Sequence, residues 1–517
     1  MHAKGKSTDV KKGMAIKVNS NVEKTEKMRD RRLSPEEASA ARKYAALIRE
    51  YNRGAGRKVY VQTFGCQQNE ADSELLAGIS ADMGYEPTSD PDEADLILVN
   101  TCAVREHAEK KALSSIGQLK HQKRRRPDMI IGVCGCMVSQ ISRADQLKNS
   151  YPYVDFTFGT SSLYMLPELV WKRLSGGPRR FLMPDDEPAV AEGLPVRRES
   201  SYRAWVSIMY GCNNFCSYCI VPYVRGRERS RRPENIVEEV RGLVADGVKD
   251  ITLLGQNVNS YGKGCSFDCD FADLIMRLAD IDGDWKLHFM TSHPKDASHK
   301  LIDAMAANPH VARQLHLPLQ SGSDRVLAAM NRHYDTARYL ETVDYAREKM
   351  PDIVLSSDII VGFPGETDEE FEATLDILRR VRYDMVYSFI YSPRSGTPAA
   401  AMTDQVPDEV KGKRMDALLA LQTEISGEIN RKYIGKNMRV LCDGKSKTDP
   451  NVTSARTEGG KIVLFDGGNI TTATQVISEN STMFRTIKKH EIILESAIKE
   501  LCRIILHLGN TAMGAGL

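Results

Sequence analysis

The chain has 517 residues, of which 41% are hydrophobic and 27% are charged, and its formal net charge is +2. This balance is typical of a globular protein of about three domains and excludes a bulk polycation, although a local basic groove is compatible with it. The sequence contains no run of about 18 apolar residues and no apolar leader, so we expect no membrane span and a cytoplasmic location with reduced cysteines.

Residues 1–56 carry an excess of basic residues and are expected to be largely disordered. One helix is predicted within this extension, because Ser34 can cap it, Pro35 suits its first position and Glu37 completes a capping box. The apolar pattern of this helix ends near Gly54.

A first compact domain is predicted over residues 57–175, where strand patterns alternate with helical ones. The strand-like runs are 58–63, 95–100 and 129–134. Alternating strands and helices predict an open parallel α/β sheet. Residues 176–200 are rich in proline and glycine, which predicts a linker.

A second domain is predicted over residues 201–428. Its six strand-like runs are 206–210, 251–254, 286–290, 314–317, 355–361 and 386–391. Helical patterns separate most of these runs, and six β/α units of this length fit an incomplete TIM-like barrel. Short strands over 431–468 suggest a small β-barrel. The tail, 469–517, instead carries apolar residues at helical spacing, which predicts either a reading frame that diverges near Gly468 or a helical cap.

The sharpest motif is a cysteine triplet directly after the first barrel strand, in YGCNNFCSYC. Cys212, Cys216 and Cys219 have the spacing Cys-x3-Cys-x2-Cys. Three thiolates on one loop can hold three irons of a 4Fe-4S cluster and leave the fourth iron open for a small ligand. Inert buried cysteines or a zinc site are the alternatives, but zinc usually takes four protein ligands and no histidine lies near this loop.

A second triplet is distributed over the first domain. Cys66, Cys102 and Cys136 each follow one of its three strand patterns. Because the carboxyl ends of parallel strands share one rim, these thiols could converge there. From spacing alone, three strand-end cysteines without a common role are an equally good interpretation. Cys134, within the strand pattern, is expected to pack in the core, and Cys265 and Cys269 are expected to be free thiols.

The triplet of Cys212, Cys216 and Cys219 resembles the motif of the radical S-adenosylmethionine superfamily, and we call it the radical motif and its loop the radical loop. Its pairing with a distal cysteine triplet resembles the methylthiotransferases. Within these, the chain is similar to the MiaB family of tRNA methylthiotransferases. The runs that carry this resemblance include NTCAVRE, IMYGCNNFCSYCIVPYVRGRERSRRPENIVEEV, LLGQNVNSYG, TSHPKD, LHLPLQSGSDRVLAAMNR, SSDIIVGFPGET and IYSPRSGTPAA. They span about residues 57–430.

The resemblance implies an α/β fold of three parts: an N-terminal open α/β methylthiotransferase domain, an incomplete (β/α)6 radical SAM barrel, and a small C-terminal TRAM-like β-barrel that is truncated here. It implies two 4Fe-4S clusters, one on Cys66, Cys102 and Cys136 and one on Cys212, Cys216 and Cys219, the latter binding S-adenosylmethionine. The implied reaction is radical methylthiolation at C2 of N6-isopentenyladenosine beside the anticodon of tRNA.

Contacts to the cofactor are expected, from the resemblance and from strand position, at Tyr218, Gln256, Gln320 and Asp358. RNA contacts are expected in the run 225–232, which directly follows the cysteine loop. The arginines of this run are Arg225, Arg227, Arg229, Arg231 and Arg232. Arginine pairs with phosphate, which dominates nucleic-acid affinity. A second basic run, 120–126, is as well explained by a solvated helix end.

The expected partners are a tRNA carrying isopentenyladenosine and an electron donor protein of the flavodoxin or ferredoxin type, and the chain is expected to be a monomer. Two rival interpretations remain at this point. One is a methylthiotransferase that acts on threonylcarbamoyladenosine in tRNA or on a ribosomal-protein aspartate. The other is a non-catalytic iron–sulfur protein that binds RNA.

Overall fold

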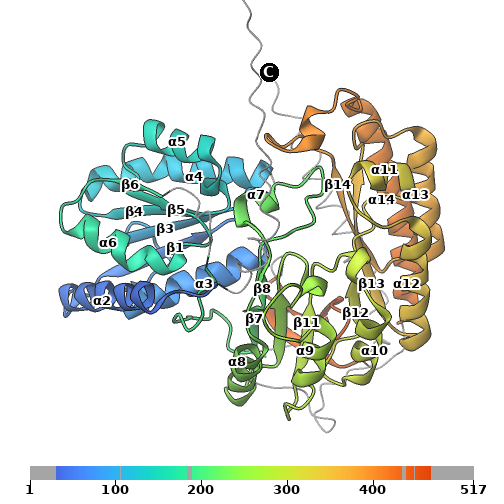
Figure 1. Ribbon diagram of the computed structural model, residues 1–517, viewed down its shortest axis with the longest axis horizontal. Coiled ribbons are helices and arrows are strands. Elements are labelled where there is room, and N and C mark those ends of the chain that lie inside the picture. The colour runs from blue at the N-terminus through green and yellow to red at the C-terminus, as the bar shows by residue number, and fades with distance from the viewer. Residues whose placement is uncertain (1–30, 105, 183–188, 434–437, 447–448, 467–517) are drawn as a thin grey trace, which may run out of the picture.

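A computed structural model describes residues 31–104, 106–182, 189–433, 438–446 and 449–466. Two domains lie side by side in Figure 1, with α3 and α7 at their junction. The predicted tail, 469–517, and the start of the basic extension lie outside the described residues. Among the helices of the described ranges, none is long and apolar enough to cross a bilayer.

The first domain is built on a six-stranded parallel sheet with the strand order β2-β1-β3-β4-β5-β6. The strands are β1 (Lys58–Thr63), β2 (Glu86–Pro87), β3 (Leu96–Thr101), β4 (Ile130–Gly135), β5 (Phe156–Phe158) and β6 (Arg180–Phe181). Strands β3 and β4 are buried along their whole length, as expected for central parallel strands. The three predicted strands are thus confirmed within one residue at each end.

Helices cover both faces of this sheet. The helices are α2 (Pro35–Asn52), α3 (Gln67–Asp82), α4 (Glu106–Arg125), α5 (Ile141–Ser150) and α6 (Leu166–Leu174). On one face, α2, α3 and α6 contribute to a core that includes Ile48, Leu76 and Leu169. On the other face, α4 and α5 contribute Ile116 and Leu147. The capping box predicted for α2 is present, and this helix packs on α6.

The second domain contains six parallel barrel strands in two groups of three, β11-β10-β7 and β12-β13-β14. The strands are β7 (Arg203–Ser207), β10 (Asp250–Leu254), β11 (Lys286–Phe289), β12 (Gln314–His316), β13 (Val354–Val361) and β14 (Met385–Ile390). An isolated bridge between Leu287 and Val311 connects the two groups. Within the described residues, β7 and β14 do not pair with each other. The six-stranded arc is therefore open, as expected for an incomplete barrel.

An outer layer of helices surrounds this arc (Figure 1). The helices of the domain are α7 (Val221–Arg225), α8 (Pro233–Ala245), α9 (Phe271–Leu278), α10 (His299–Ala307), α11 (Asp324–Ala329), α12 (Thr336–Lys349), α13 (Asp368–Val381) and α14 (Asp408–Arg431). Residues from these helices and from the strands form one continuous core that includes Ile236, Leu274, Val343 and Leu378. A short pair of strands, β8 (Met209–Tyr210) and β9 (Arg229–Ser230), closes the loop that carries the radical motif.

The C-terminal described segment is a three-stranded antiparallel sheet of β15 (Val440–Lys445), β16 (Val452–Thr457) and β17 (Ile462–Asp466). Ion pairs link it to the barrel domain near the starts of barrel strands: Lys461 to Asp384 at 2.7 Å and Glu458 to Lys286 at 3.0 Å. The described part of the predicted small barrel is therefore a single sheet seated at the amino-terminal end of the larger barrel.

The linker between the domains packs closely on α3, and Gly78 permits this contact. A Cβ at Gly78 would lie 2.2 Å from the carbonyl oxygen of Pro195 and 2.7 Å from the Cα of Val196. In contrast, a Cβ at Gly117 in α4 would meet no atom within 4 Å. Glycine is thus needed at position 78 because the linker lies too close for a Cβ, and not because of the conformation of the helix.

We predict that Gly78→Ala lowers the free energy of unfolding by about 1–3 kcal/mol, because the linker must shift to make room for the methyl group. Gly117→Ala is the matched control and should be neutral or stabilising by up to about 1 kcal/mol, because alanine favours a helix. Denaturant unfolding followed by circular dichroism measures both. Equal effects of the two substitutions would contradict the packing assigned to Gly78.

Candidate functional site: two cysteine triplets at a domain junction

The radical motif forms a tight loop between β8 and β9. Gly211 has a φ of +73°, and a Cβ there would lie 2.1 Å from the carbonyl oxygen of Arg227, so only glycine fits. The N–H of Cys212 donates to the carbonyl of Gly226 at 3.1 Å, and the N–H of Cys219 donates to that of Cys216 at 2.9 Å. These bonds hold the three cysteines of the motif on one short, closed turn.

The segment that follows α11 supports this loop from outside. The side chain of Asn331 donates to the carbonyl oxygens of Asn214 and Phe215 at 3.1 and 3.0 Å. The hydroxyl of Ser217 donates to the carbonyl of Ala329 at 2.8 Å. These contacts allow Phe215 to keep a left-handed φ of +46°, which costs energy in a residue other than glycine. The loop is therefore fixed by structure that is present without any bound group.

The thiols of this loop are free and mostly buried. Cys212 and Cys216 are buried and Cys219 is half-buried. Burial raises the pKa of Cys212 to about 12 and that of Cys219 to about 12. The thiols of Cys212 and Cys219 are therefore neutral near pH 7, and a bound metal would supply the charge that stabilises their thiolates. Three soft sulfur donors on one loop fit an iron–sulfur cluster.

The second triplet also gathers at one rim, as the strand-end argument predicts. Cys66 is the exposed residue before α3, whereas Cys102 after β3 and Cys136 after β4 are buried. The N–H of Cys136 donates to the carbonyl of Thr101, beside Cys102, at 2.9 Å. A Cβ built on Gly65, next to Cys66, would lie 3.0 Å from the Cβ of Cys102.

Burial raises the pKa of Cys136 to about 12, and the neighbouring thiols of Cys102 and Cys66 contribute in the same direction. The three sulfurs thus share one environment at the rim. In the described ranges, no three histidine, cysteine or acidic side chains are arranged to hold a single metal ion. Cys134, by contrast, points into the sheet core, as predicted.

Asn69 in α3 organises this rim, a role that was not predicted from the sequence. Its side-chain nitrogen donates to the carbonyl of Thr101 at 3.0 Å and to the side-chain oxygen of Asn100 at 3.1 Å. Its side-chain oxygen accepts from the thiol of Cys66 at 3.5 Å. Asn69 therefore connects the strand ends that carry Cys66 and Cys102, and its place in the run CQQNEAD was the available signal.

The two rims meet where the domains touch. Cys136 and Ala103 of the first domain share a small apolar cluster with Ile220 and Val224, which lie just after the radical loop. The guanidinium of Arg394 donates to the carbonyl of Val104 at 3.0 Å. The loops after β3 and β14 are thus also in contact. Both cysteine triplets therefore border the same domain junction, around α7 in Figure 1.

The four proposed cofactor contacts lie in different parts of the barrel domain: Gln256 and Gln320 follow barrel strands, Tyr218 is on the radical loop and Asp358 is within β13. Gln256, directly after β10, is half-buried. Tyr218 packs against a cluster that contains Met330 and Phe363. Gln320 is buried with a φ of +71°, and its N–H donates to the carbonyl of Asp358 at 2.8 Å. Asp358 lies within β13 and not at its carboxyl end, with Oδ2 3.6 Å from Nε2 of His316. Contact with a cofactor stays a prediction for all four residues.

Several buried polar atoms at the barrel rim have no hydrogen-bond partner among the residues that the structure describes. They are the side-chain oxygen of Asn214, both polar atoms of Asn259, the hydroxyl of Ser292 and Nε2 of His293. Burial, reinforced by the charge of Arg332, lowers the pKa of His293, so its ring is neutral. Unsatisfied buried polar atoms are costly, and a polar ligand would satisfy them. A cofactor with polar groups, such as S-adenosylmethionine, fits this rim. The runs GQNVNSYG and TSHPKD contained the signal for Asn259, Ser292 and His293.

The arginine run 225–232 is divided by the fold. Arg225 and Arg229 are buried, and Arg231 is half-buried in ion pairs with Glu192 and Glu239. The burial of these three corrects the expectation that the whole run faces RNA. Arg227 and Arg232 are exposed, and direct RNA contact remains a prediction for these two. A spacing pattern does not reveal which arginines find partners within the protein.

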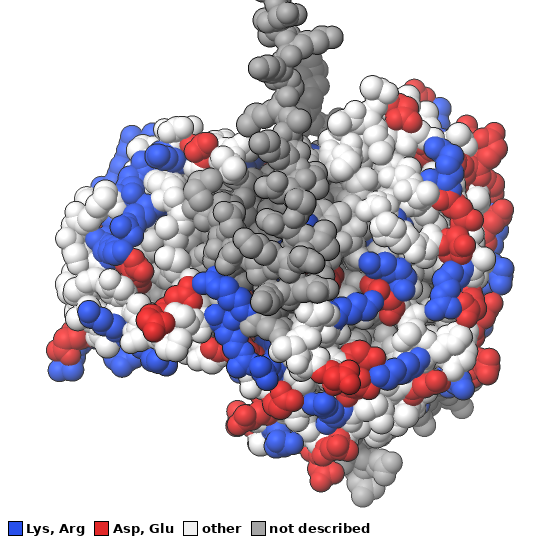
Figure 2. Space-filling model, viewed as in Figure 1, with Lys and Arg blue, Asp and Glu red and all other residues white. Residues whose placement is uncertain are grey.

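On the face seen in Figure 2, a further group of basic side chains lies over the first domain. Figure 2 shows lysines and arginines along its outer helices, whereas acidic and basic side chains alternate over the barrel helices. In the run 120–126, Lys120, Arg124 and Arg125 are exposed, and Arg125 pairs with Asp92 at 2.6 Å. The end of α4 is therefore basic and solvated, as one of the two interpretations expected.

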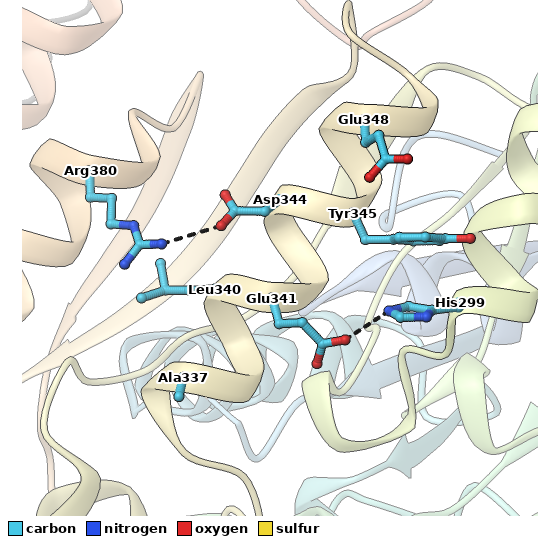
Figure 3. A pocket seen from close by; sticks show the side chains of 8 residues that line it. All are labelled: His299, Ala337, Leu340, Glu341, Asp344, Tyr345, Glu348 and Arg380. Carbon is cyan, nitrogen blue, oxygen red and sulfur yellow. Dashed lines mark hydrogen bonds and ion pairs between the residues drawn. The ribbon is translucent and has the colours of Figure 1, made fainter.

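A pocket of about 530 Å³ lies on the outside of the barrel, between α10, α12 and α13 (Figure 3). His299 stacks on Tyr345 with ring centroids 3.8 Å apart and pairs with Glu341 at 2.9 Å. Arg380 pairs with Asp344 across the same pocket at 3.2 Å. Because these groups pair with one another on the outer helices, we regard the pocket as a packing feature of the surface.

Comparison with known proteins agrees with this organisation. Residues 58–159 match the family described as "Uncharacterized protein family UPF0004", and residues 206–378 match the radical SAM superfamily. Among solved structures, the radical S-adenosylmethionine methyltransferase TsrM from Kitasatospora setae is similar in fold, with a TM-score of 0.51 and 16% identity over 67% of this chain and 74% of TsrM.

Curated relatives are much more similar in sequence. The tRNA-2-methylthio-N(6)-dimethylallyladenosine synthase of Thermoanaerobacter sp. (strain X514) is 49% identical over 435 residues, which cover 84% of this chain and 92% of the relative. The protein of the same name from Acetivibrio thermocellus is 48% identical and covers 85% of this chain and 93% of the relative. With its two cysteine-bearing domains and this degree of identity, the chain belongs to the tRNA-2-methylthio-N(6)-dimethylallyladenosine synthase family of radical SAM enzymes.

Proposed function

We propose that this protein adds a methylthio group to C2 of N6-isopentenyladenosine, next to the anticodon of tRNA. The observation that carries the proposal is the meeting of two cysteine triplets at one domain junction in a chain about half identical to enzymes of that name. The relatives' name also favours the isopentenylated base over threonylcarbamoyladenosine or a ribosomal-protein aspartate. A purely RNA-binding role would leave the polar rim of the barrel without a ligand.

The enzyme uses two 4Fe-4S clusters and S-adenosylmethionine. In our proposal, Cys212, Cys216 and Cys219 hold the cluster that binds S-adenosylmethionine, and the first-domain triplet holds the other. When bound, these groups supply the radical and sulfur-transfer chemistry that an unactivated C–H bond requires. The electron is proposed to come from a flavodoxin- or ferredoxin-type protein, and the enzyme is proposed to work as a cytoplasmic monomer.

The chain's own residues prepare the site for this chemistry. The fixed radical loop positions its ligands, and apolar residues such as Ile220 and Val224 keep water from the junction. The neutral ring of His293 would offer a hydrogen bond to a cofactor bound at this rim without adding a positive charge there. Exposed Arg227 and Arg232 lie on the same segment, where they can hold phosphates of the anticodon loop while the target base leaves its stack.

Replacing Cys212, Cys216 and Cys219 together by alanine should leave about half of the iron in the reconstituted protein, because the other triplet binds its cluster independently. Cleavage of S-adenosylmethionine should be lost. Iron analysis and chromatographic detection of 5′-deoxyadenosine measure the two results. Formation of 5′-deoxyadenosine by this variant would show that the radical site lies elsewhere.

Cys102→Ala should separate the two halves of the reaction. The variant should still form 5′-deoxyadenosine but no methylthiolated nucleoside, because Cys102 lies outside the barrel on the rim of the first domain. Cys134→Ala is the matched control: this thiol is also buried, in β4, but points into the core. The control should keep its full iron content and its product, and a Cys102 variant with normal product yield would contradict a ligand role.

The double substitution of Arg227 and Arg232 by glutamine should weaken tRNA binding and lower the slope of log affinity against log salt by about 1–2, because two phosphate contacts are lost. Arg379→Gln is the control, since this arginine is exposed but pairs with acidic residues on α13. Filter binding at several salt concentrations checks the slopes. An unchanged slope in the double variant would show that these arginines do not contact RNA.

A further inference from the structure

Arg225, the last residue of α7, is a buried cation that crosses the domain junction. Its side chain is 5% exposed, and its Nη2 pairs with a carboxylate oxygen of Asp72 at 2.9 Å. Its Nε lies 3.1 Å from the sulfur of Cys136, and Nη2 lies 3.4 Å from the side-chain oxygen of Asn69. Arg225 belongs to the barrel domain, whereas all three partners belong to the first domain.

These partners are themselves tied to the cysteine rim. The side-chain oxygen of Asn69 that faces Arg225 also accepts from the thiol of Cys66, and its nitrogen donates to the carbonyl beside Cys102. Asp72 accepts a further hydrogen bond from Gln68 at 3.3 Å, and Gln68 donates to the hydroxyl of Ser207 at the end of β7. The network around one guanidinium therefore reaches the surroundings of the whole first-domain triplet.

The same backbone segment is bonded to the radical loop. Gly226, which follows Arg225, accepts the hydrogen bond from the N–H of Cys212. A displacement of Arg225 would therefore disturb the hydrogen bonds of Cys136 in one triplet and of Cys212 in the other. The ion pair with Asp72 would suffice to hold the two domains together, so the contact of Nε with the sulfur of Cys136 is an additional feature of this arginine.

We propose that Arg225 is a positioning residue that docks the first-domain cluster against the radical loop and tunes this cluster by donating a charge-assisted hydrogen bond to the sulfur of Cys136. The inference rests on the proposed function, since it assumes that the first-domain triplet holds an iron–sulfur cluster. Hydrogen bonds and positive charge at a ligand sulfur stabilise the more negative, reduced state of a cluster. Asp72 opposes this effect because its carboxylate offsets part of the charge.

This assignment predicts opposite shifts for the two members of the ion pair. Arg225→Gln removes the cation and should lower the reduction potential of the first-domain cluster. Asp72→Asn leaves the cation without its counter-charge and should raise the potential. Arg225→Lys keeps a charge but loses the planar fork that reaches several acceptors at once, so its shift should be smaller than that of Arg225→Gln.

The experiment uses the full-length chain reconstituted with iron and sulfide, with Cys212, Cys216 and Cys219 replaced by alanine so that the first-domain cluster is observed alone. Iron content and an electron paramagnetic resonance titration against potential are measured for each variant. Arg379→Gln in the same background is the control and should leave the potential unchanged. In the enzyme with both clusters, Arg225→Gln should also raise the ratio of 5′-deoxyadenosine to methylthiolated product several-fold.

An Arg225→Gln chain that keeps its iron and shows the potential of the parent would overturn the tuning role. Shifts of the same sign in the Arg225→Gln and Asp72→Asn variants would also overturn it, because they would indicate general loosening of the junction. If Arg225→Gln does not fold, Arg225→Lys and Asp72→Asn still test the direction of the shift.

The proposed function has a separate test, in which tRNA is treated with the unsubstituted enzyme and its nucleosides are analysed for the methylthio group. A lack of methylthiolated product there contradicts the proposed function, while the potential shifts still decide the role of Arg225. Parent protein without iron on the first-domain triplet would overturn the inference about Arg225.

Discussion

The buried ion pair between Arg225 and Asp72 is the constraint on which the arrangement of the two domains depends. Taking both charges out of water is costly, and removing one member of such a pair typically costs about 3–5 kcal/mol because the other remains buried and unpaired. The pair therefore favours one relative position of the domains. In that position Cys136 packs against Val224, and the strand ends of both parallel sheets border one junction.

This position matters because neither domain alone has a complete site. A parallel sheet gathers its functional groups at the carboxyl ends of its strands, and here two such rims must face each other to serve one substrate. The contact between Arg394 and Val104 joins the loop after β14 to the loop after β3. The junction is thus held by a side-chain-to-backbone hydrogen bond as well as by the buried ion pair.

Much of this architecture could be predicted from the sequence because its signals are local. Strands β3, β4 and β13 are long, mostly buried runs, so their positions were predicted within one residue. The capping box of α2 is a four-residue pattern. Strands β2, β5 and β6 were missed because they have only two or three residues, too few to show a period. Strand β6 lies in a segment whose proline and glycine content indicated a linker.

The site was predicted less completely, because burial and pairing depend on residues far apart in the sequence. The arginine run looks uniform, yet Arg225 finds its partners about 150 residues earlier, in another domain. Asn69 and His293 have no distinctive spacing, and only the folded rim shows what surrounds them. Cysteine spacing identified the radical loop because its three cysteines lie within eight residues of one another, and their role as cluster ligands stays a prediction. For the first-domain triplet it gave only strand-end positions.

Burial also determines how the chain can acquire its clusters. The thiols of Cys136, Cys212 and Cys219 all have pKa values raised to about 12, so near pH 7 each would have to release a proton to bind iron as we propose. The free energy needed to remove these protons disfavours a metal ion that binds thiolates weakly. It favours a cluster that forms several strong iron–sulfur bonds at once. Once formed, the same dry surroundings limit access of water and oxidants to the sulfurs. The burial that hinders loading is therefore also what suits the junction to chemistry that water would quench.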